Sequence, residues 1–278
     1  MKTDEKWLEI RKSGDFNGIA GKLSVTPMLV RLAINRGVEE KDISEYLFGG
    51  RLHDPHLLKD LDLAAEILSE KIRQGRRIRI IGDYDIDGVN ATYILVKGLR
   101  KCGGNVDAAI PDREKDGYGI NEHLISLAKE EGVDTVVTCD NGIAAREAVR
   151  LAKELSLTMI VTDHHDVPYE EKDGKRSYLL PAADAVVNPK RADSEYPYRE
   201  LCGAVVAWKL VQVLYERFSV PETEAEAFYE NAAFATVGDV MELTGENRFL
   251  VREGLKHLRK TENPGMKALI LKSGLAPE

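Results

Sequence analysis

The sequence has few cysteines and no long apolar run. Its three cysteines, Cys102, Cys139 and Cys202, lie far apart without CxxC spacing, so the sequence indicates neither a disulfide framework nor a zinc knuckle. No apolar run approaches the roughly 18 residues that a membrane span requires. The first residues are charged, unlike the apolar core of a signal peptide. We therefore expect a cytoplasmic protein that is neither exported nor inserted in a membrane.

Positive charge is also in short supply. The chain has 39 Lys and Arg residues against 47 Asp and Glu residues, which gives a formal net charge of −8. Non-specific binding of nucleic acid depends on basic side chains that neutralise phosphates, so the surface as a whole is unsuited to that role. A local site whose carboxylates are neutralised by metal ions remains compatible with a phosphate-containing substrate. The length of 278 residues and the 43% hydrophobic content predict about two domains with buried cores.

The spacing of apolar residues predicts helices at both ends of the chain and an α/β region between them. Within residues 1–76, apolar residues recur at three- and four-residue steps in segments that end in glycine. From Arg77, short β-rich runs alternate with helical runs, which is typical of an α/β fold with a parallel β-sheet flanked by helices. The predicted strands are 77–81, 106–110, 135–138, 158–162 and, after a polar, turn-rich segment at 170–183, 184–188. After Tyr198 we expect helices again, with breaks at Pro221 and Pro264.

Acidic and histidine side chains follow three of the predicted strands. Asp83, Asp85 and Asp87 occupy alternate positions in "GDYDIDG", after the first strand. In extended backbone alternate side chains share a face, so these carboxylates would repel each other unless a cation lay between them. Asp140 follows "TVVT", and the run Asp163-His164-His165-Asp166 follows "TMIVT". Because ligands bind beyond the carboxyl ends of parallel strands, we expect one site at this edge of the sheet.

Two simpler interpretations apply to the aspartates. The spacing of Asp83, Asp85 and Asp87 matches the start of an EF-hand calcium loop, but the twelfth position is Ile94 rather than Glu, and a strand precedes the loop. A single Asp after a strand is often a helix N-cap, and Asp140 or the next residue would then cap the following helix. Because aspartates follow three predicted strands, a shared metal site is favoured over both simpler interpretations.

Other candidate residues surround these strand ends. We expect the neighbours His164 and His165 to point apart, so that one binds metal while the other faces substrate. The loop "PDREKDGYG" contains Arg113 and Tyr118, which suit a phosphate with an attached base. A basic run is interpreted as a solvated helix end and strand start rather than a DNA contact; it comprises Arg73, Arg76, Arg77 and Arg79.

Aspartates with a neutral imidazole form a hard oxygen and nitrogen ligand set. Such a set suits Mn²⁺ or Mg²⁺ better than zinc, and the number of carboxylates favours two ions. Two ions about 3.5–4 Å apart activate an attacking hydroxide and stabilise the leaving oxygen in phosphoryl displacement. The predicted chemistry is therefore hydrolysis of a phosphoester or a phosphoanhydride.

The motifs "GDYDIDG", "TCDNGI", "VTDHHD" and "ATVGDV" resemble those of the DHH phosphoesterase superfamily. Within it, the sequence is most similar to the RecJ-like family of bacterial single-strand-specific 5′→3′ DNA exonucleases. The resemblance implies the DHH phosphoesterase fold, release of 5′-mononucleotides from single-stranded DNA, and a role in DNA repair and recombination. It also implies Mn²⁺ or Mg²⁺ as cofactor, and single-strand-binding protein or a helicase as possible protein partners.

The resemblance also implies roles for individual residues. Asp85 and Asp87 match ligands of one manganese each, and Asp140 and Asp239 match bridging carboxylates. His164 matches a ligand of the second ion.

The resemblance implies roles for residues beside these ligands as well. His165 matches the residue that contacts the scissile phosphate, and Asp163 would orient both histidines. The resemblance leaves open whether Asp83 touches metal. The role of Asp239 is implied by the resemblance alone, because a lone Asp in a helical segment carries no sequence signal.

Two departures from the superfamily bear on function. Manganese pyrophosphatases and small oligoribonucleases have a histidine four residues before the aspartate that matches Asp85, and here that residue is Ile81. This disfavours a small-substrate phosphodiesterase or pyrophosphatase. The full set of ligands disfavours a non-catalytic scaffold with the same fold.

RecJ-like chains continue into a second catalytic domain and an OB-type domain, and we expect this sequence to be the N-terminal catalytic portion without them. We expect residues 1–76 to form a helical segment that packs on the core. Residues 77–278 would form the DHH catalytic domain, with an α/β part at 77–200 and a helical part at 201–278.

Overall fold

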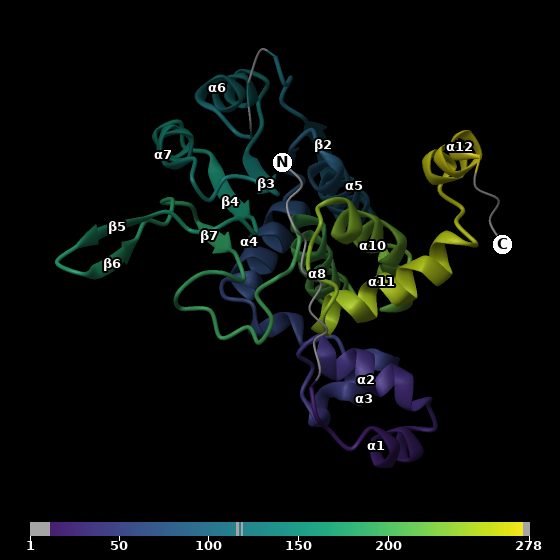
Figure 1. Cartoon of the computed structure of the whole chain (residues 1–278). Coiled ribbons are helices and arrows are strands. Elements are labelled where there is room, and N and C mark those ends of the chain that lie inside the picture. The colour runs from purple at the N-terminus through teal and green to yellow at the C-terminus, as the bar shows by residue number, and fades with distance from the viewer. Residues whose placement is uncertain (1–11, 115–116, 118, 275–278) are drawn as a thin grey trace, which may run out of the picture.

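The computed structural model describes residues 12–114, 117 and 119–274 (Figure 1). Its centre is a five-stranded sheet in the order β2-β1-β3-β4-β7, and every neighbouring pair is parallel. The strands are β1 (Arg77–Ile81), β2 (Asn105–Ala109), β3 (Thr135–Cys139), β4 (Thr158–Thr162) and β7 (Ala185–Val187). The predicted α/β fold with a parallel sheet is confirmed.

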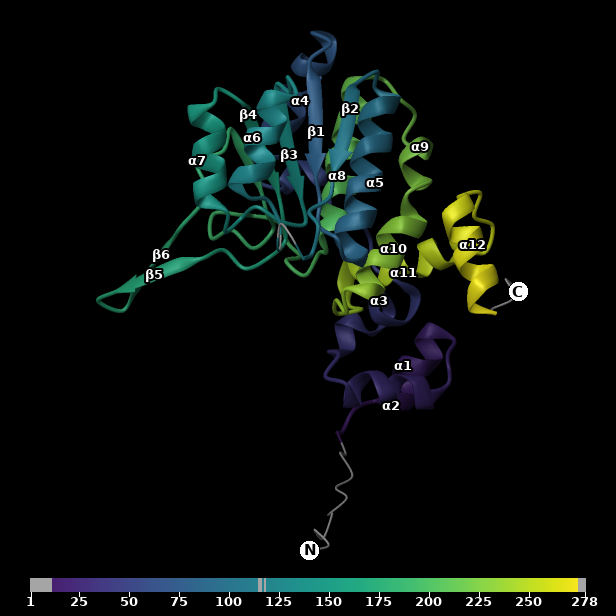
Figure 2. The same cartoon turned by 90° about the horizontal axis from the view of Figure 1, so that it is seen from above.

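Helices cover both faces of the sheet (Figure 2). One face packs against α6 (Glu122–Glu130) and α7 (Arg146–Glu154), and the other against α4 (Leu61–Arg73), α5 (Ile86–Lys101) and α8 (Gly203–Arg217). Alternate strand residues face opposite sides, so Ile80 of β1 joins the α4, α5 and α8 core while Ile81 joins the other. Burial on both faces explains why β3, β4 and β7 consist mostly of apolar residues.

The direction of winding reverses between β1 and β3. From β1 the chain passes through α5 on one face to β2, and then through α6 on the other face to β3, on the far side of β1. In parallel sheets, such a reversal leaves a crevice between the carboxyl ends of the two central strands, where ligands bind. The residues after β1 and β3 therefore meet at this position.

The remaining helices lie beside this α/β core. The C-terminal helices are α9 (Thr223–Glu226), α10 (Tyr229–Gly238), α11 (Gly245–Leu258) and α12 (Pro264–Ser273), and α10 packs on α5 and α11. At the N-terminus, α1 (Phe16–Leu23), α2 (Pro27–Asn35) and α3 (Ile43–Phe48) enclose a separate apolar cluster. Short 3₁₀ turns lie at η1 (Glu40–Asp42) and η2 (Pro55–Leu57). The division into domains at residues 76 and 200 stays a prediction. Among the described helices, none has the length and apolar character to cross a bilayer.

An antiparallel hairpin projects from the sheet domain, largely within the segment predicted to be polar and turn-rich. It consists of β5 (Tyr169–Lys172) and β6 (Lys175–Tyr178), and it extends away from the core (Figures 1 and 2). Asp173 and Gly174 connect the strands with φ angles of 53° and 72°. Positive φ at both residues fits the tight turn that Asp-Gly favours in hairpins. The polar segment contains the expected turn, and the two short strands beside it were not predicted.

The last arginine of the basic run, Arg79, is buried rather than solvated, whereas Arg73 and Arg76 are exposed. Arg79 is 7% exposed, and it donates hydrogen bonds to Asp107 at 2.7 Å and to Glu131 at 2.6 Å. Arg77 donates to Asp107 as well, at 2.6 Å. The hydrogen bond with Asp107 raises the pKa of Arg79, although burial opposes it. These arginines join β1, β2 and the end of α6, and the interpretation as solvated is wrong for Arg79.

A buried ion pair joins α8 and α11. Lys209 and Glu246 are both fully buried, with 3.3 Å between Nζ and Oε2. Tyr196 donates its hydroxyl to Oε1 of Glu246 at 2.5 Å, and the N–H group of His53 donates to Oε2 at 2.9 Å. Burial lowers the pKa of Lys209, and the charge of Glu246 opposes that shift. One carboxylate therefore connects four segments of the chain.

We predict that Glu246→Gln lowers the free energy of unfolding by about 3–5 kcal/mol, because it leaves the Lys209 charge buried without its partner. Urea unfolding followed by circular dichroism measures the change. Glu262→Gln is the control, since this carboxylate is 93% exposed in its pair with Lys267 and surface pairs contribute about 0–1 kcal/mol. Equal effects of the two substitutions would contradict the role of the buried pair.

Candidate metal centre

The chain turns between β1 and α5, and this turn carries the first group of aspartates. Asp85 is the N-cap of α5, and its Oδ1 accepts hydrogen bonds from the N–H groups of Asp87 and Gly88, both at 2.9 Å. Asp87 thus lies in the first helical turn, and the prediction that the three aspartates share one face of an extended chain is wrong. Asp83 is fully buried beneath Gly88, where an added Cβ would lie 2.6 Å from the Asp83 backbone.

The N-terminus of α8 fixes the buried carboxylate of Asp87. The N–H group of Gly203 donates to Oδ2 at 2.6 Å, and that of Ala204 donates to Oδ1 at 2.7 Å. The positive end of the helix dipole stabilises a carboxylate at this position. An added Cβ on Gly203 would lie 2.6 Å from Cβ of Asp140, so the close approach requires glycine. Sequence reasoning missed both α8 residues.

Asp140 follows β3 and faces the turn after β1. It is buried, with a φ angle of 61°, and its Oδ1 lies 3.0 Å from Nε2 of His164. The N-cap of α7 is Ala145, so the alternative that Asp140 or Asn141 caps this helix is wrong. Asn141 instead donates to the carbonyl groups of Ile81, at 3.2 Å, and Cys139, at 2.9 Å. It thereby joins the ends of β1 and β3.

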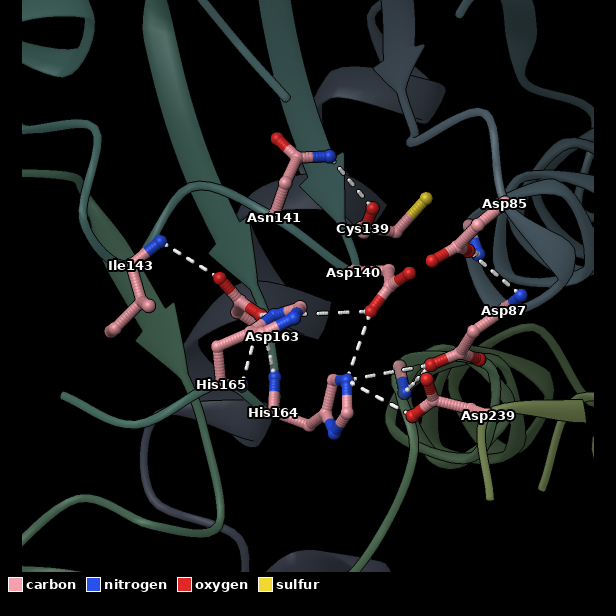
Figure 3. Close-up of polar contacts among 12 residues, drawn as sticks. Asp85, Asp87, Cys139, Asp140, Asn141, Ile143, Asp163, His164, His165 and Asp239 are labelled. Carbon is pink, nitrogen blue, oxygen red and sulfur yellow. Dashed lines mark hydrogen bonds and ion pairs between the residues drawn. The ribbon is translucent and has the colours of Figure 1, made fainter. Parts of the chain in front are cut away.

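Asp163 organises the loop after β4 rather than joining the other carboxylates (Figure 3). Its Oδ1 accepts hydrogen bonds from the N–H groups of His164 and His165 and from Nδ1 of His165, while Oδ2 accepts from the N–H group of Ile143. Burial alone would raise the pKa of Asp163, but the hydrogen bonds from His165 and Ile143 overcome it and lower the pKa. The role of Asp163 in orienting the histidines stays a prediction.

The two histidines face different partners although their rings lie together. Nε2 of His164 lies 3.0 Å from Asp140, 3.5 Å from Asp87 and 3.7 Å from Asp239. Nδ1 of His165 lies 2.8 Å from Oδ1 of Asp163. Their ring centroids are 4.5 Å apart, so the expectation that the side chains point apart is wrong. His164 is buried among carboxylates, whereas the side chain of His165 is 44% exposed.

Asp239 reaches the site from the C-terminal end of α10. A hydrogen bond of 2.9 Å from Asn231 of α10 to Asn90 of α5 holds the two helices together, and both side chains are buried. An added Cβ on Gly238 would lie 2.4 Å from Ile86, which shows how closely the helices pack. This packing places Asp239 within 3.7 Å of His164, across 75 residues of sequence.

The candidate ligands form adjoining groups that suit two ions. In each group the donor atoms lie within 4.8 Å of one another, and the groups are Asp83, Asp85 and Asp140; Asp87, His164 and Asp239; and Asp140, His164 and His165. In octahedral coordination at 2.0–2.1 Å, neighbouring donors are about 2.9 Å apart and opposite donors about 4.1 Å apart. The distances of 3.0–3.7 Å around His164 fall in this range. Oxygen donors with one imidazole suit Mn²⁺ or Mg²⁺.

Burial and like charge destabilise the ionised carboxylates when no cation is present. Burial raises the pKa of Asp140, and the charges of Asp87 and Asp85 raise it further. Burial also raises the pKa of Asp239, with an additional effect of Asp87, and the pKa of Asp83. A divalent ion would lower these pKa values, since opposite charge favours the ionised form.

A cavity and a basic residue flank the metal-ligand groups. The cavity measures about 370 Å³ and is bordered by Gly119, Asn141, Ile143 and His165. On the β1 side, the guanidinium of Arg113 lies 5.3 Å from the ring centre of Tyr84, next to Asp83 and Asp85. The predicted Tyr118 lies outside the described residues.

The match to a known family decides the identity of this arrangement. Residues 77–236, more than half of the chain, match the model of the DHH family, N-terminal domain. The chain belongs to the DHH family.

Relatives of this DHH-family chain are named as single-stranded-DNA-specific exonuclease RecJ. The Bacillus subtilis (strain 168) protein is 36% identical over 256 residues, and the match covers 91% of this chain and 31% of that protein. The Escherichia coli (strain K12) protein is 33% identical over 255 residues, covering 88% of this chain and 42% of that protein. The chain therefore spans less than half the length of these relatives.

Solved structures show the same fold. A structure described as exonuclease RecJ bound to manganese has a TM-score of 0.69 and 35% identity, covering 80% of this chain and 54% of that chain. RecJ from Thermus thermophilus in complex with Mn²⁺ has a TM-score of 0.74 and 32% identity, covering 95% of this chain and 36% of that chain. The predicted resemblance and fold are confirmed.

We predict that Gly203→Ala lowers Mn²⁺ affinity without unfolding the chain. The new methyl group must displace Asp140 and weaken the hold of α8 on Asp87, and loss of such supporting contacts costs about 10–100-fold in metal affinity. Titration calorimetry with Mn²⁺ measures the loss. Gly21→Ala is the matched control, because nothing lies within 4 Å of the added Cβ. Unchanged affinity in the Gly203 variant would contradict the assigned constraint.

We predict that alanine substitutions of the two histidines cause different defects, one in metal affinity and the other in turnover. His164→Ala removes a nitrogen from the carboxylate cluster and should lower Mn²⁺ affinity. His165→Ala should retain metal but lower turnover about 10²–10³-fold, the usual cost of losing one group that stabilises developing charge. Calorimetry and single-turnover cleavage separate the two effects. Equal loss of metal in both variants would overturn this division.

Proposed function

We propose that this chain is the catalytic core of a metal-dependent 5′→3′ exonuclease that releases 5′-mononucleotides from single-stranded DNA. The observation that supports the proposal most is the set of three adjoining ligand groups on the sheet edge, two of which share Asp140. Relatives named as single-stranded-DNA-specific exonucleases provide the substrate class. Solved structures of RecJ bound to manganese or magnesium support a divalent cofactor.

The proposed first-ion ligands lie on the β1 side of the site. Asp85 and Asp140 would bind this ion, and Asp83 lies in the same group. Ile81 is fully buried in the apolar core, so it supplies no donor at the position where pyrophosphatases of the superfamily have histidine. We assign Asp83 as the added oxygen donor on this ground.

The proposed second-ion ligands come from α5, α10 and the loop after β4. They are Asp87, His164 and Asp239. Asp140 belongs to the first-ion group and also lies 3.0 Å from Nε2 of His164, so its carboxylate oxygens would serve both ions. When bound, two such ions supply an activated hydroxide and stabilise the leaving oxygen.

The protein side chains would orient the substrate around these ions. His165 borders the 370 Å³ cavity, and a protonated imidazole there would donate a hydrogen bond to a phosphate oxygen. Its hydrogen bond to Asp163 raises its pKa, although burial opposes this effect. Protonation is thereby favoured. Arg113, on the β1 side, would bind phosphate through its guanidinium fork. Tyr118 stays a candidate for stacking on a base.

The cellular setting follows from the proposed reaction. Single strands arise during DNA repair and recombination, and the proposed enzyme would meet them in the cytoplasm. Single-strand-binding protein or a helicase would be natural partners. Residues 1–76 would form a helical segment beside the catalytic domain at 77–278.

The decisive assay supplies the chain with Mn²⁺ and a 5′-phosphorylated single strand labelled at the 3′ end. We expect stepwise shortening from the 5′ end and 5′-mononucleotide products, and no activity once a chelator is added. A duplex and pyrophosphate serve as comparison substrates. Asp140→Asn is the inactive control, since it removes the proposed bridging charge. Preferential hydrolysis of pyrophosphate, or cleavage that survives chelation, would contradict the proposal.

A further inference from the structure

The β5–β6 hairpin emerges directly from the candidate site. Tyr169 is four positions after His165, so their Cα atoms lie no more than about 14 Å apart. The hairpin base is closed by a hydrogen bond of 2.7 Å from the N–H group of Leu179 to the carbonyl of Pro168. Figure 2 shows the hairpin projecting from the edge at which the strands of the main sheet end. A long strand that leaves the metal centre on this side would pass the base of the hairpin.

One face of the hairpin presents an aromatic pair to solvent. Tyr169 and Tyr178 are opposite each other in the register, with ring centroids 6.0 Å apart, and they are 45% and 43% exposed. The guanidinium of Arg176 lies 4.5 Å from the ring centre of Tyr169, while Glu171 lies 3.9 Å from Arg176. Exposed aromatic rings beside a cation form the kind of surface on which unpaired bases stack.

The opposite face brings two positive charges together. Lys172 and Lys175 are directly opposite in the register, next to the turn. Like charges at directly opposite positions destabilise a hairpin, and neither ammonium group pairs with a carboxylate of the described residues. An anion between or beside these lysines would remove that repulsion. A phosphate backbone supplies such anions.

We propose that the β5–β6 hairpin is a binding surface for the single strand, on which bases stack against Tyr169 and Tyr178 while phosphates contact Lys172 and Lys175. This inference rests on the proposed function and deepens it, because it places a second contact beyond the scissile bond. The hairpin contains as many basic as acidic residues, in a chain of net charge −8. It therefore offers a polyanion a less repulsive surface than the protein as a whole.

The test compares the parent chain with the double variant Tyr169→Val and Tyr178→Val. Valine favours β-strands, so the variant removes the rings while it supports the hairpin. Fluorescence anisotropy with Mn²⁺ measures binding of 5′-phosphorylated oligothymidylates of about 3 and about 20 nucleotides, with phosphorothioate linkages to block cleavage. We expect affinity for the long strand to fall about fivefold or more, as for loss of one stacked base, while the short strand binds unchanged. The double Phe variant should bind like the parent.

The role of the two lysines is tested through the salt dependence of the affinity for the long strand. For single strands each neutralised phosphate contributes about 0.7 to the slope of log affinity against log salt. Lys172→Gln with Lys175→Gln should therefore reduce the slope by about 1.4 for the long strand. Lys41→Gln with Lys267→Gln, on distant elements, is the matched control and should leave it unchanged.

Different outcomes separate this inference from the proposed function. If the parent binds the long strand and the Val variant binds it equally well, the proposed role of the hairpin is wrong. Equal losses for both strand lengths would also contradict a contact beyond the scissile bond. If the parent binds neither strand, the proposed function and this inference fail together.

Discussion

The repulsion among carboxylates at the carboxyl ends of β1 and β3 is the constraint on which the rest of the structure depends. Backbone N–H groups offset part of it, because the first N–H groups of α5 donate to Asp85 and those of α8 donate to Asp87. Buried Asp140 has a raised pKa, which burial and neighbouring carboxylates cause. The arrangement is thus prepared for divalent ions, and it places strand ends, helix N-termini and one histidine at a single edge of the sheet.

The parts of the fold that sequence analysis predicted are those whose signal is local. β1, β3 and β4 are buried on both faces, so each is a short apolar run between helical patterns. The polar residues directly after these runs mark the edge at which ligands bind, which placed Asp140 and His164 correctly in space. The resemblance to the DHH family added Asp239, which no local pattern distinguishes.

The features that local sequence patterns missed depend on tertiary contacts or on ambiguous patterns. Asp239 approaches the site only because α10 packs on α5 through Asn231 and Asn90, which are far apart in the sequence. The alternating aspartates fit the two-residue period of a strand, although α5 begins among them at Ile86. The hairpin has polar residues on both faces, so apolar alternation is absent and only Asp-Gly marks its turn. The need for glycine at Gly203 comes from the closeness of Asp140, a contact between distant segments.

The number of ions bound at the sheet edge tests the central claim most directly. Titration of the metal-free chain with Mn²⁺, followed by calorimetry, should show two ions per chain, and Asp140→Asn should weaken both because this carboxylate adjoins both ligand groups. An exposed aspartate such as Asp166, 92% exposed in its side chain, provides the matched substitution that should leave both ions bound. A single ion in the parent chain, or two ions bound with undiminished affinity by the Asp140 variant, would contradict the account.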